Sequence, residues 1–143
     1  MTSLKRLAAQ AARIRYRSTD FSQESYPRHV GTTHQIPNQT PFTPIGSIPE
    51  VSSTFAYLEQ TYGAVNEHQV GIGESTCSAI FGAIPLGAPN GTALLSIDEL
   101  TRIAMERSTT AKDAVQLMGG LAVKYGFYGA GASEGTGEAL VVS

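Results

Sequence analysis

The sequence contains little cysteine, little charge and no long apolar run. Cys77 is the one cysteine among 143 residues, which excludes an intramolecular disulfide and a metal site built from several cysteines. Charged residues make up 15% of the chain and the net charge is -2, whereas a nucleic-acid-binding surface needs clustered Lys and Arg. No stretch approaches the ~18 consecutive apolar residues of a membrane-spanning helix. We therefore expect a soluble protein with neither nucleic-acid nor membrane partners.

The first 21 residues carry five basic side chains and one acidic side chain. Five basic residues precede the first acidic one, Asp20: Lys5, Arg6, Arg13, Arg15 and Arg17. Apolar residues at helical spacing predict a basic helix or extension with one apolar stripe: Leu4, Leu7, Ala8, Ala11 and Ile14. A mitochondrial transit peptide and a surface helix share these features, and we favour the surface helix because serine enrichment is weak. The compartment stays open, with the cytoplasm slightly favoured.

Proline sets off the next segment, residues 22–50. Five prolines lie in it, at positions 27, 37, 41, 44 and 49. Proline fixes its own φ and moves the preceding residue out of the helical region, so we expect an extended loop or linker. Regular structure is expected to begin near Val51, and residues 51–143 are expected to form the folded domain.

Two strands are predicted in the first part of this domain. Residues 54–58 mix β-branched and aromatic side chains, Tyr62-Gly63 offers a turn, and residues 64–72 predict a second strand, so a β-hairpin is the simplest arrangement. In the second strand Gly71 and Gly73 leave one face as bare backbone. Such glycines mark either close approach of a substrate or chain segment, or a twist against a packed layer.

Two helices are predicted in the second half of the chain. Ser96 with Glu99 forms a capping box before an apolar helical pattern, and Thr110 with Asp113 gives a similar start signal. Gly126 suits the C-terminal cap of the second helix. That helix has a predicted buried stripe of six residues: Ala114, Leu117, Met118, Leu121, Ala122 and Tyr125.

Glycine also shapes the rest of this region. Gly119-Gly120 in the second helix weakens it by about 1 kcal/mol per glycine, which indicates tight helix packing or a break. Residues 84–92 predict a loop, residues 126–137 a mobile glycine-rich loop, and residues 138–143 a final strand. The order of elements predicts an α+β fold in which an antiparallel sheet packs against two helices.

Four residues around the second strand could carry chemistry. Alternation along one strand would put Asn66 and His68 on one face, where they could donate to an oxyanion, but two hydrogen-bonded structural residues are the plainer alternative. Ser75 lies in a stretch that partly matches a nucleophile elbow, although no histidine follows it to complete the usual order. Apolar residues follow Cys77, so we expect a buried, inert thiol.

Six blocks of the chain, spread over residues 26–143, agree with one enzyme family. They lie at 48–51 (Ile-Pro-Glu-Val), 54–57, 66–78 (with Asn-Glu-His-Gln and Gly-Glu-Ser-Thr-Cys), 98–100, 110–114 and 137–139. Together they resemble the cysteine dipeptidases of the N-terminal-nucleophile (Ntn) hydrolase superfamily, the group that includes dipeptidase A and the secernins. This resemblance identifies the chain as a candidate member of that family.

The resemblance implies a four-layer αββα fold, of which this chain would form a part that is incomplete at both ends. It implies hydrolysis of dipeptides or short peptides without a metal or organic cofactor. In the family a terminal cysteine attacks the peptide carbonyl, and its own α-amino group acts as the base. By resemblance, substrate-lining or oxyanion roles fall to four residues: Asn66, Glu74, Ser75 and Thr76.

The family's nucleophile has no counterpart in this sequence, because no cysteine precedes Cys77. Thr2 could become a terminal nucleophile after removal of Met1, but a basic helical pattern rather than a strand follows it. We therefore expect either a dipeptidase fragment that lacks its catalytic strand or a non-catalytic relative that serves binding or assembly. An unfinished sheet edge predicts association with a second copy or with the remainder of the domain.

Overall fold

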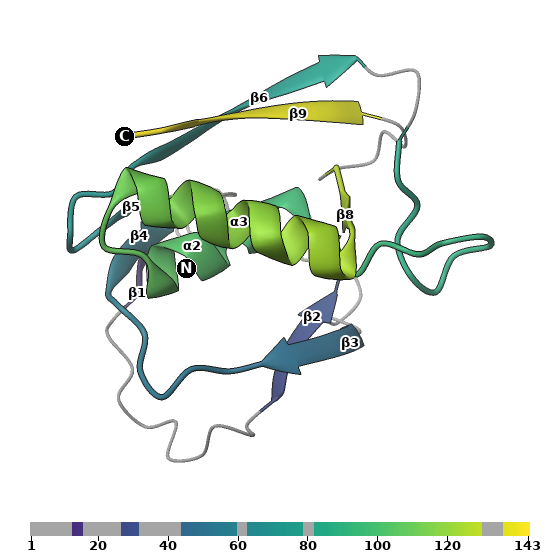
Figure 1. The fold of residues 1–143 in the computed structure, drawn as a ribbon, viewed down its shortest axis with the longest axis horizontal. Coiled ribbons are helices and arrows are strands. Elements are labelled where there is room, and N and C mark those ends of the chain that lie inside the picture. Colours follow the sequence, from purple (N-terminus) through teal and green to yellow (C-terminus); the bar gives the residue numbers. More distant parts are fainter. Residues whose placement is uncertain (1–12, 16–26, 32–43, 60–62, 79–81, 130–135) are drawn as a thin grey trace, which may run out of the picture.

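The computed structural model describes residues 13–15, 27–31, 44–59, 63–78, 82–129 and 136–143. These residues form two α-helices and nine short β-strands (Figure 1). The strands are β1 (Arg13–Arg15), β2 (Pro27–Gly31), β3 (Pro44–Pro49), β4 (Tyr57–Glu59), β5 (Gly63–Asn66), β6 (Ile72–Ser78), β7 (Leu95–Ser96), β8 (Phe127–Tyr128) and β9 (Thr136–Val142). The helices are α2 (Ile97–Arg107) and α3 (Ala111–Tyr125). The described chain is therefore a mixed α+β fold.

The strands pair in four small sheets. Antiparallel pairing joins β1, β4 and β5 in one sheet, β2 with β3 in a second, and β6 with β9 in a third. Strands β7 and β8 pair in parallel, and the helices α2 and α3 supply the crossover that parallel strands need. In Figure 1 the β6–β9 pair lies on one side of the helices and the β2–β3 pair on the other. These antiparallel sheets and two helices confirm the predicted α+β class.

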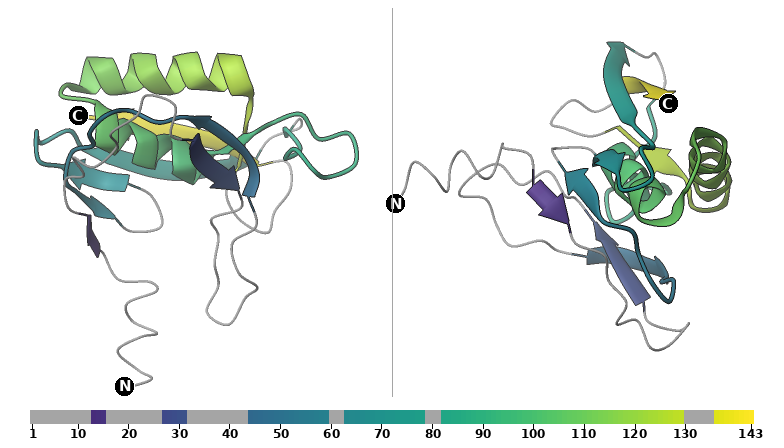
Figure 2. Two further views of the ribbon diagram at one scale, coloured as in Figure 1. Left: turned by 90° about the horizontal axis from the view of Figure 1, so that it is seen from below. Right: turned by 90° about the vertical axis from the view of Figure 1, so that its left-hand side faces the viewer.

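Helix α2 lies at the centre of the core. Figure 2 shows it between α3 and the strands, with α3 at the edge of the molecule. The core consists of twelve buried residues from both helices, four strands and Val70: Ile48, Tyr57, Val70, Ile72, Leu95, Ile97, Leu100, Ile103, Ala104, Met105, Ala114 and Met118. Because Ile48 of β3 belongs to this core, β3 is part of the packed domain rather than of a linker.

The first third of the chain contains strands where the sequence predicts a helix and a linker. Strand β1 pairs with β4, so the predicted helix does not include Ile14; residues 1–12 and 16–21 lie outside the described residues. Strands β2 and β3 pair within the predicted linker, so regular structure begins before Val51. Their prolines lie at strand ends, where proline is tolerated.

The predicted hairpin is confirmed as β4 and β5, although part of its turn, residues 60–62, lies outside the described residues. The second strand is shorter than predicted, because the chain turns after Asn66, with φ 65 at Gln69, and resumes as β6. Gly71 and Ser143 exchange two backbone hydrogen bonds of 2.9 and 3.0 Å. A Cβ at Gly71 would also lie 3.0 Å from Ser143 Oγ, so the close approach of this segment favours glycine here.

The predicted start of α3 is confirmed. For α2 the predicted first residue is confirmed, but the predicted hydrogen bond from the Ser96 side chain is not. Thr110 Oγ1 accepts a hydrogen bond of 3.1 Å from the Asp113 N–H. Ser96 occupies the N-cap position of α2 but makes no side-chain cap, and Glu99 is buried with its Oε2 3.5 Å from Arg102 Nη1. The hydrogen bond predicted from the Ser96 side chain is therefore wrong.

Helix α3 has the predicted stripe, with Ala114 and Met118 buried and the other four residues partly buried against the core. The predicted C-terminal cap, Gly126, has φ 71. The glycine pair at 119–120 does not break the helix, and no tight packing against it is found among the described residues. In the predicted loop at 126–137 the chain instead forms β8 directly after the cap; residues 130–135 lie outside the described residues.

Neither described helix combines the length and the apolar character that crossing a membrane requires.

We expect Gly126→Ala to destabilise the fold and Gly120→Ala to stabilise it. Gly126 has φ 71 and ψ 152, and a Cβ there would lie 3.0 Å from the Cα of Ala93. Since this backbone region is nearly restricted to glycine, the free energy of unfolding should fall by about 1–3 kcal/mol. An added methyl at Gly120 meets no atom within 4 Å, so helix propensity should raise it by about 0.5–1 kcal/mol. Urea denaturation measures both, and equal effects would contradict the expectation.

Candidate functional site

The β6–β9 pair carries most of the predicted site residues. Its pairing is continuous, from Ile72 opposite Val142 to Ser78 opposite Thr136. Successive residues of a strand point to opposite faces and paired residues share a face. The inner face packs on the core through Ile72, Leu140 and Val142. The outer face of the pair is exposed and small or apolar: Gly73, Ser75, Cys77, Ala139 and Val141.

Strand alternation separates the predicted site residues of β6. Glu74 lies opposite Leu140 on the inner face and is half-buried. Ser75 lies opposite Ala139 on the outer face and is exposed. The backbone of Thr76 lies opposite Glu138, while the Thr76 side chain is outside the described part. Ser75 is therefore the predicted site residue whose described side chain is open to a ligand.

Asn66, at the end of β5, is buried and uses its side chain inside the protein. Its Nδ2 donates to the carbonyl oxygens of Met105 at 3.0 Å and Ser108 at 2.8 Å. Its Oδ1 accepts from the N–H groups of His68 and Val70, both at 3.0 Å. A carboxamide has two donors and two acceptor positions, and all four are used. The geometry thus favours the structural alternative, in which Asn66 caps the end of α2 and fixes the following turn.

His68 does not share a strand face with Asn66 as predicted, because β5 ends before it. His68 lies exposed in the turn with its ring edge against Phe55, the two centroids being 4.4 Å apart. Glu67 Oε1 accepts a hydrogen bond of 2.9 Å from the Ala56 N–H. Asn66 therefore serves the protein interior, whereas His68 lies at the surface.

Cys77 is exposed, which corrects the predicted buried thiol. The alternation of β6 places it on the outer face, and its Sγ lies 3.6 Å from the carbonyl oxygen of Ser75. Ser75 itself lies in the middle of a seven-residue strand, not at a strand-to-helix turn. The nucleophile elbow is therefore absent at this position.

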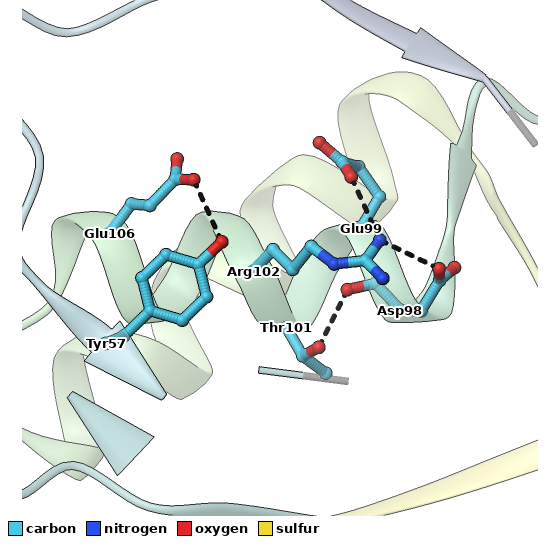
Figure 3. Close-up of polar contacts among 6 residues, drawn as sticks. All are labelled: Tyr57, Asp98, Glu99, Thr101, Arg102 and Glu106. Carbon is cyan, nitrogen blue, oxygen red and sulfur yellow. Dashed lines mark hydrogen bonds and ion pairs between the residues drawn. The ribbon is translucent and has the colours of Figure 1, made fainter. Parts of the chain in front are cut away.

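Helix α2 carries a line of buried polar residues that the sequence prediction missed (Figure 3). Asp98 is 1% exposed and Glu99 5% exposed. Arg102 Nη1 lies 2.9 Å from Asp98 Oδ2 and 3.5 Å from Glu99 Oε2, so one guanidinium compensates two carboxylates. Thr101, fully buried, donates from its hydroxyl to the Asp98 carbonyl at 2.7 Å. Charged residues at helical spacing also suit a solvent-exposed face, so the sequence contained no signal of their burial.

The same line continues to the end of α2. The Tyr57 hydroxyl donates to Glu106 Oε1 at 3.3 Å. Arg107 Nη2 lies 2.8 Å from Glu50 Oε1 and 3.3 Å from the carbonyl oxygen of Pro49. These contacts join the helix to β4 and to the end of β3. They have the character of a structural network, because each charged group already has a partner inside the protein.

Ser96 and Tyr128 face the start of this line from the β7–β8 pair. Both side chains are buried, and neither hydroxyl makes a hydrogen bond of good geometry. Burial raises the pKa of Tyr128 from 10.0 to about 12; the Asp98 charge adds to the rise, the neighbouring Ser96 hydroxyl opposes it, and Glu99 adds a little. Tyr128 is therefore a neutral phenol at physiological pH.

The described residues contain no group of three or more His, Cys, Asp or Glu side chains that could hold a metal ion. In comparisons with known proteins, no family model, no curated protein and no solved structure matches the chain. The functional assignment therefore rests on the chain's own residues.

We expect Asn66→Ala to lower the free energy of unfolding by about 2–4 kcal/mol, because it leaves two buried carbonyls and two N–H groups without their partner. His68→Ala is the control, since it removes an exposed ring contact and should cost less than about 1 kcal/mol. Urea denaturation compares the two. Similar losses would contradict the structural role of the Asn66 side chain.

Because of the raised pKa of Tyr128, we expect the free energy of unfolding to fall at alkaline pH. Its folded pKa of about 12 lies above the ordinary value of 10.0, so the folded state holds the proton more tightly than the unfolded state. The corresponding stabilisation is fully present below pH 10 and is lost as the pH rises from there to about 12. Tyr128→Phe should therefore flatten the pH dependence of the urea midpoint in this range. An unchanged slope in the variant would contradict the assignment.

Proposed function

We propose that this chain contributes the substrate-facing part of a cysteine-type dipeptidase of the Ntn-hydrolase class, with dipeptides or short peptides as ligands. The proposal builds on the six blocks of sequence that resemble this family. It assigns substrate contact to the outer face of the β6–β9 pair and assigns no metal or cofactor. The α+β arrangement, with helices on the inner side of this pair, is compatible with part of an αββα sandwich.

The open surface around Ser75 is the observation that supports the proposal most directly. The Ser75 hydroxyl is exposed, and an added Cβ at the neighbouring outer-face position, Gly73, would meet no atom within 4 Å. A short peptide can therefore approach the strand closely at Gly73 while the Ser75 hydroxyl donates to its carbonyl or accepts from its N–H. Asn66 would take part indirectly, by fixing the turn that leads into β6.

The nucleophile is a separate question from substrate contact. Cys77 shares the outer face with Ser75, but the contact that the structure records for its thiol is a backbone carbonyl, which cannot take up a proton as a base does. We therefore assign Cys77 no catalytic role. The family's mechanism uses a terminal cysteine, and the other candidate, Thr2, lies outside the described residues.

A non-catalytic role in binding or assembly is the second candidate. It is favoured by Val141, which is 73% exposed on the same outer face, because an apolar side chain there suits a protein partner as well as a peptide. Both candidates place the contact on the outer face. They differ in whether a bound dipeptide is cleaved.

Binding of a dipeptide panel to the purified chain, followed by heteronuclear NMR, tests the proposed site. We expect shifts at residues 73–77 and about fivefold weaker binding in Ser75→Ala, which corresponds to the loss of one hydrogen bond. Ser52→Ala, an exposed serine between β3 and β4, is the matched control. If no dipeptide perturbs the outer face of the folded protein, the proposed function is wrong.

Release of free amino acids from the same panel separates the two candidates. We expect Cys77→Ala to leave any release unchanged, because its thiol has no described base. Release that depends on Thr2, shown by Thr2→Ala, would place the nucleophile at that terminus. Binding without release would support the non-catalytic candidate, and release abolished by Cys77→Ala would contradict the role assigned here to the thiol.

A further inference from the structure

The loop between β6 and β7 contains a tight turn built on Pro89 and Asn90, which are both exposed. Figure 1 shows this loop extending away from the helices. The Gly91 N–H donates a hydrogen bond of 2.9 Å to the Ala88 carbonyl, and Asn90 has φ 62. A proline in the second position and a positive φ in the third are typical of a type II β-turn, so residues 88–91 form such a turn.

The Asn90-Gly91 pair in this turn has a chemistry of its own. The Gly91 backbone nitrogen can bond to Asn90 Cγ; the Cγ–Nδ2 bond then breaks, and ammonia leaves with the proton of the Gly91 N–H. The product is a cyclic imide. Water opens either carbonyl of the ring and leaves an aspartate or an isoaspartate at position 90. Water is the only co-reactant, and nothing is oxidised or reduced. Glycine favours the ring closure because no side chain hinders the attacking nitrogen.

Asn90 differs from the other described asparagine in every property that matters here. It is the one asparagine of the sequence that glycine follows. Its side chain is exposed, and no hydrogen bond of that side chain with a described residue is recorded. Asn66, in contrast, is buried, precedes Glu67 and uses its carboxamide in four hydrogen bonds. Asn66 is therefore protected and serves as an internal control.

The turn restrains the same reaction. The Gly91 N–H is held by the Ala88 carbonyl, and a Cβ at Gly91 would collide with the carbonyl oxygen of Pro85. The attacking nitrogen is therefore free only when the turn opens. Such opening is local, because the base of the loop is held separately by the N–H groups of Thr92 and Ala93, which donate to the Ile84 carbonyl at 3.1 Å.

We propose that Asn90 is a site of spontaneous deamidation and that opening of the type II turn sets its rate in the folded protein. The reaction adds one negative charge to an exposed turn. An isoaspartate also inserts a methylene into the main chain, which the tight packing of Gly91 does not accommodate. The isoaspartate form should therefore lose the hydrogen bond between Ala88 and Gly91. This inference is independent of the proposed function, because it uses neither β6 nor β9.

Peptide mapping by mass spectrometry tests the proposal, after incubation of the full chain in neutral buffer with and without urea. We expect conversion at Asn90 in both samples, about tenfold faster in urea, because a hydrogen-bonded surface turn opens at a small cost in free energy. Asn66 should stay intact in the folded chain. The proposal is overturned if Asn90 stays intact in the folded chain after the denatured chain has converted, or if another asparagine of the folded chain converts first.

Two variants test whether the turn controls the rate. Pro89→Ala frees the second position of the turn, so the folded chain should convert about threefold faster, with no change in urea. Asn90→Gly is the control, because glycine suits φ 62 and removes the reacting amide; it should fold with the wild-type urea midpoint and stay unmodified. Equal rates in the folded and denatured wild-type chain, or an equal effect of Pro89→Ala in urea, would contradict control by the turn.

Discussion

The burial of helix α2 is the constraint on which the rest of the structure depends. Nine of its eleven residues are buried, and they include Asp98, Glu99 and Glu106. Unpaired carboxylates would be costly in such a position, so each needs a partner from inside the fold. Arg102 supplies it within the helix and Tyr57 supplies it from β4. The core can pack around α2 because its buried carboxylates have partners. The contacts of Glu106 with Tyr57 and of Arg107 with Glu50 also position β4 and the end of β3 against the helix.

The end of α2 shows the same constraint acting on the backbone. The last carbonyls of a helix have no partner within it. Asn66 donates to two carbonyls at this end, and the Phe55 N–H donates to the Glu106 carbonyl at 2.9 Å. These contacts fix β4, β5 and the turn before β6 relative to the helix. The turn that leads into β6 is thus held in place by an amide whose recorded hydrogen bonds are all made inside the protein.

Features that depend on neighbouring residues in the chain could be predicted from the sequence, whereas contacts between distant segments could not. The start of α3 at Thr110, its cap at Gly126 and the hairpin follow from neighbours in the chain, so they could be predicted. The β2–β3 pairing was missed because the prolines of this segment predict a loop. Ile48 of β3 packs in the core with residues distant in the sequence, and no local pattern indicates that contact. For Asn66, strand alternation predicted the sheet face on which its side chain lies. Its structural role depends instead on the turn at Gln69 and on the carbonyls at the end of α2, which are distant in the sequence. Burial of charge on α2 has no local signal at all.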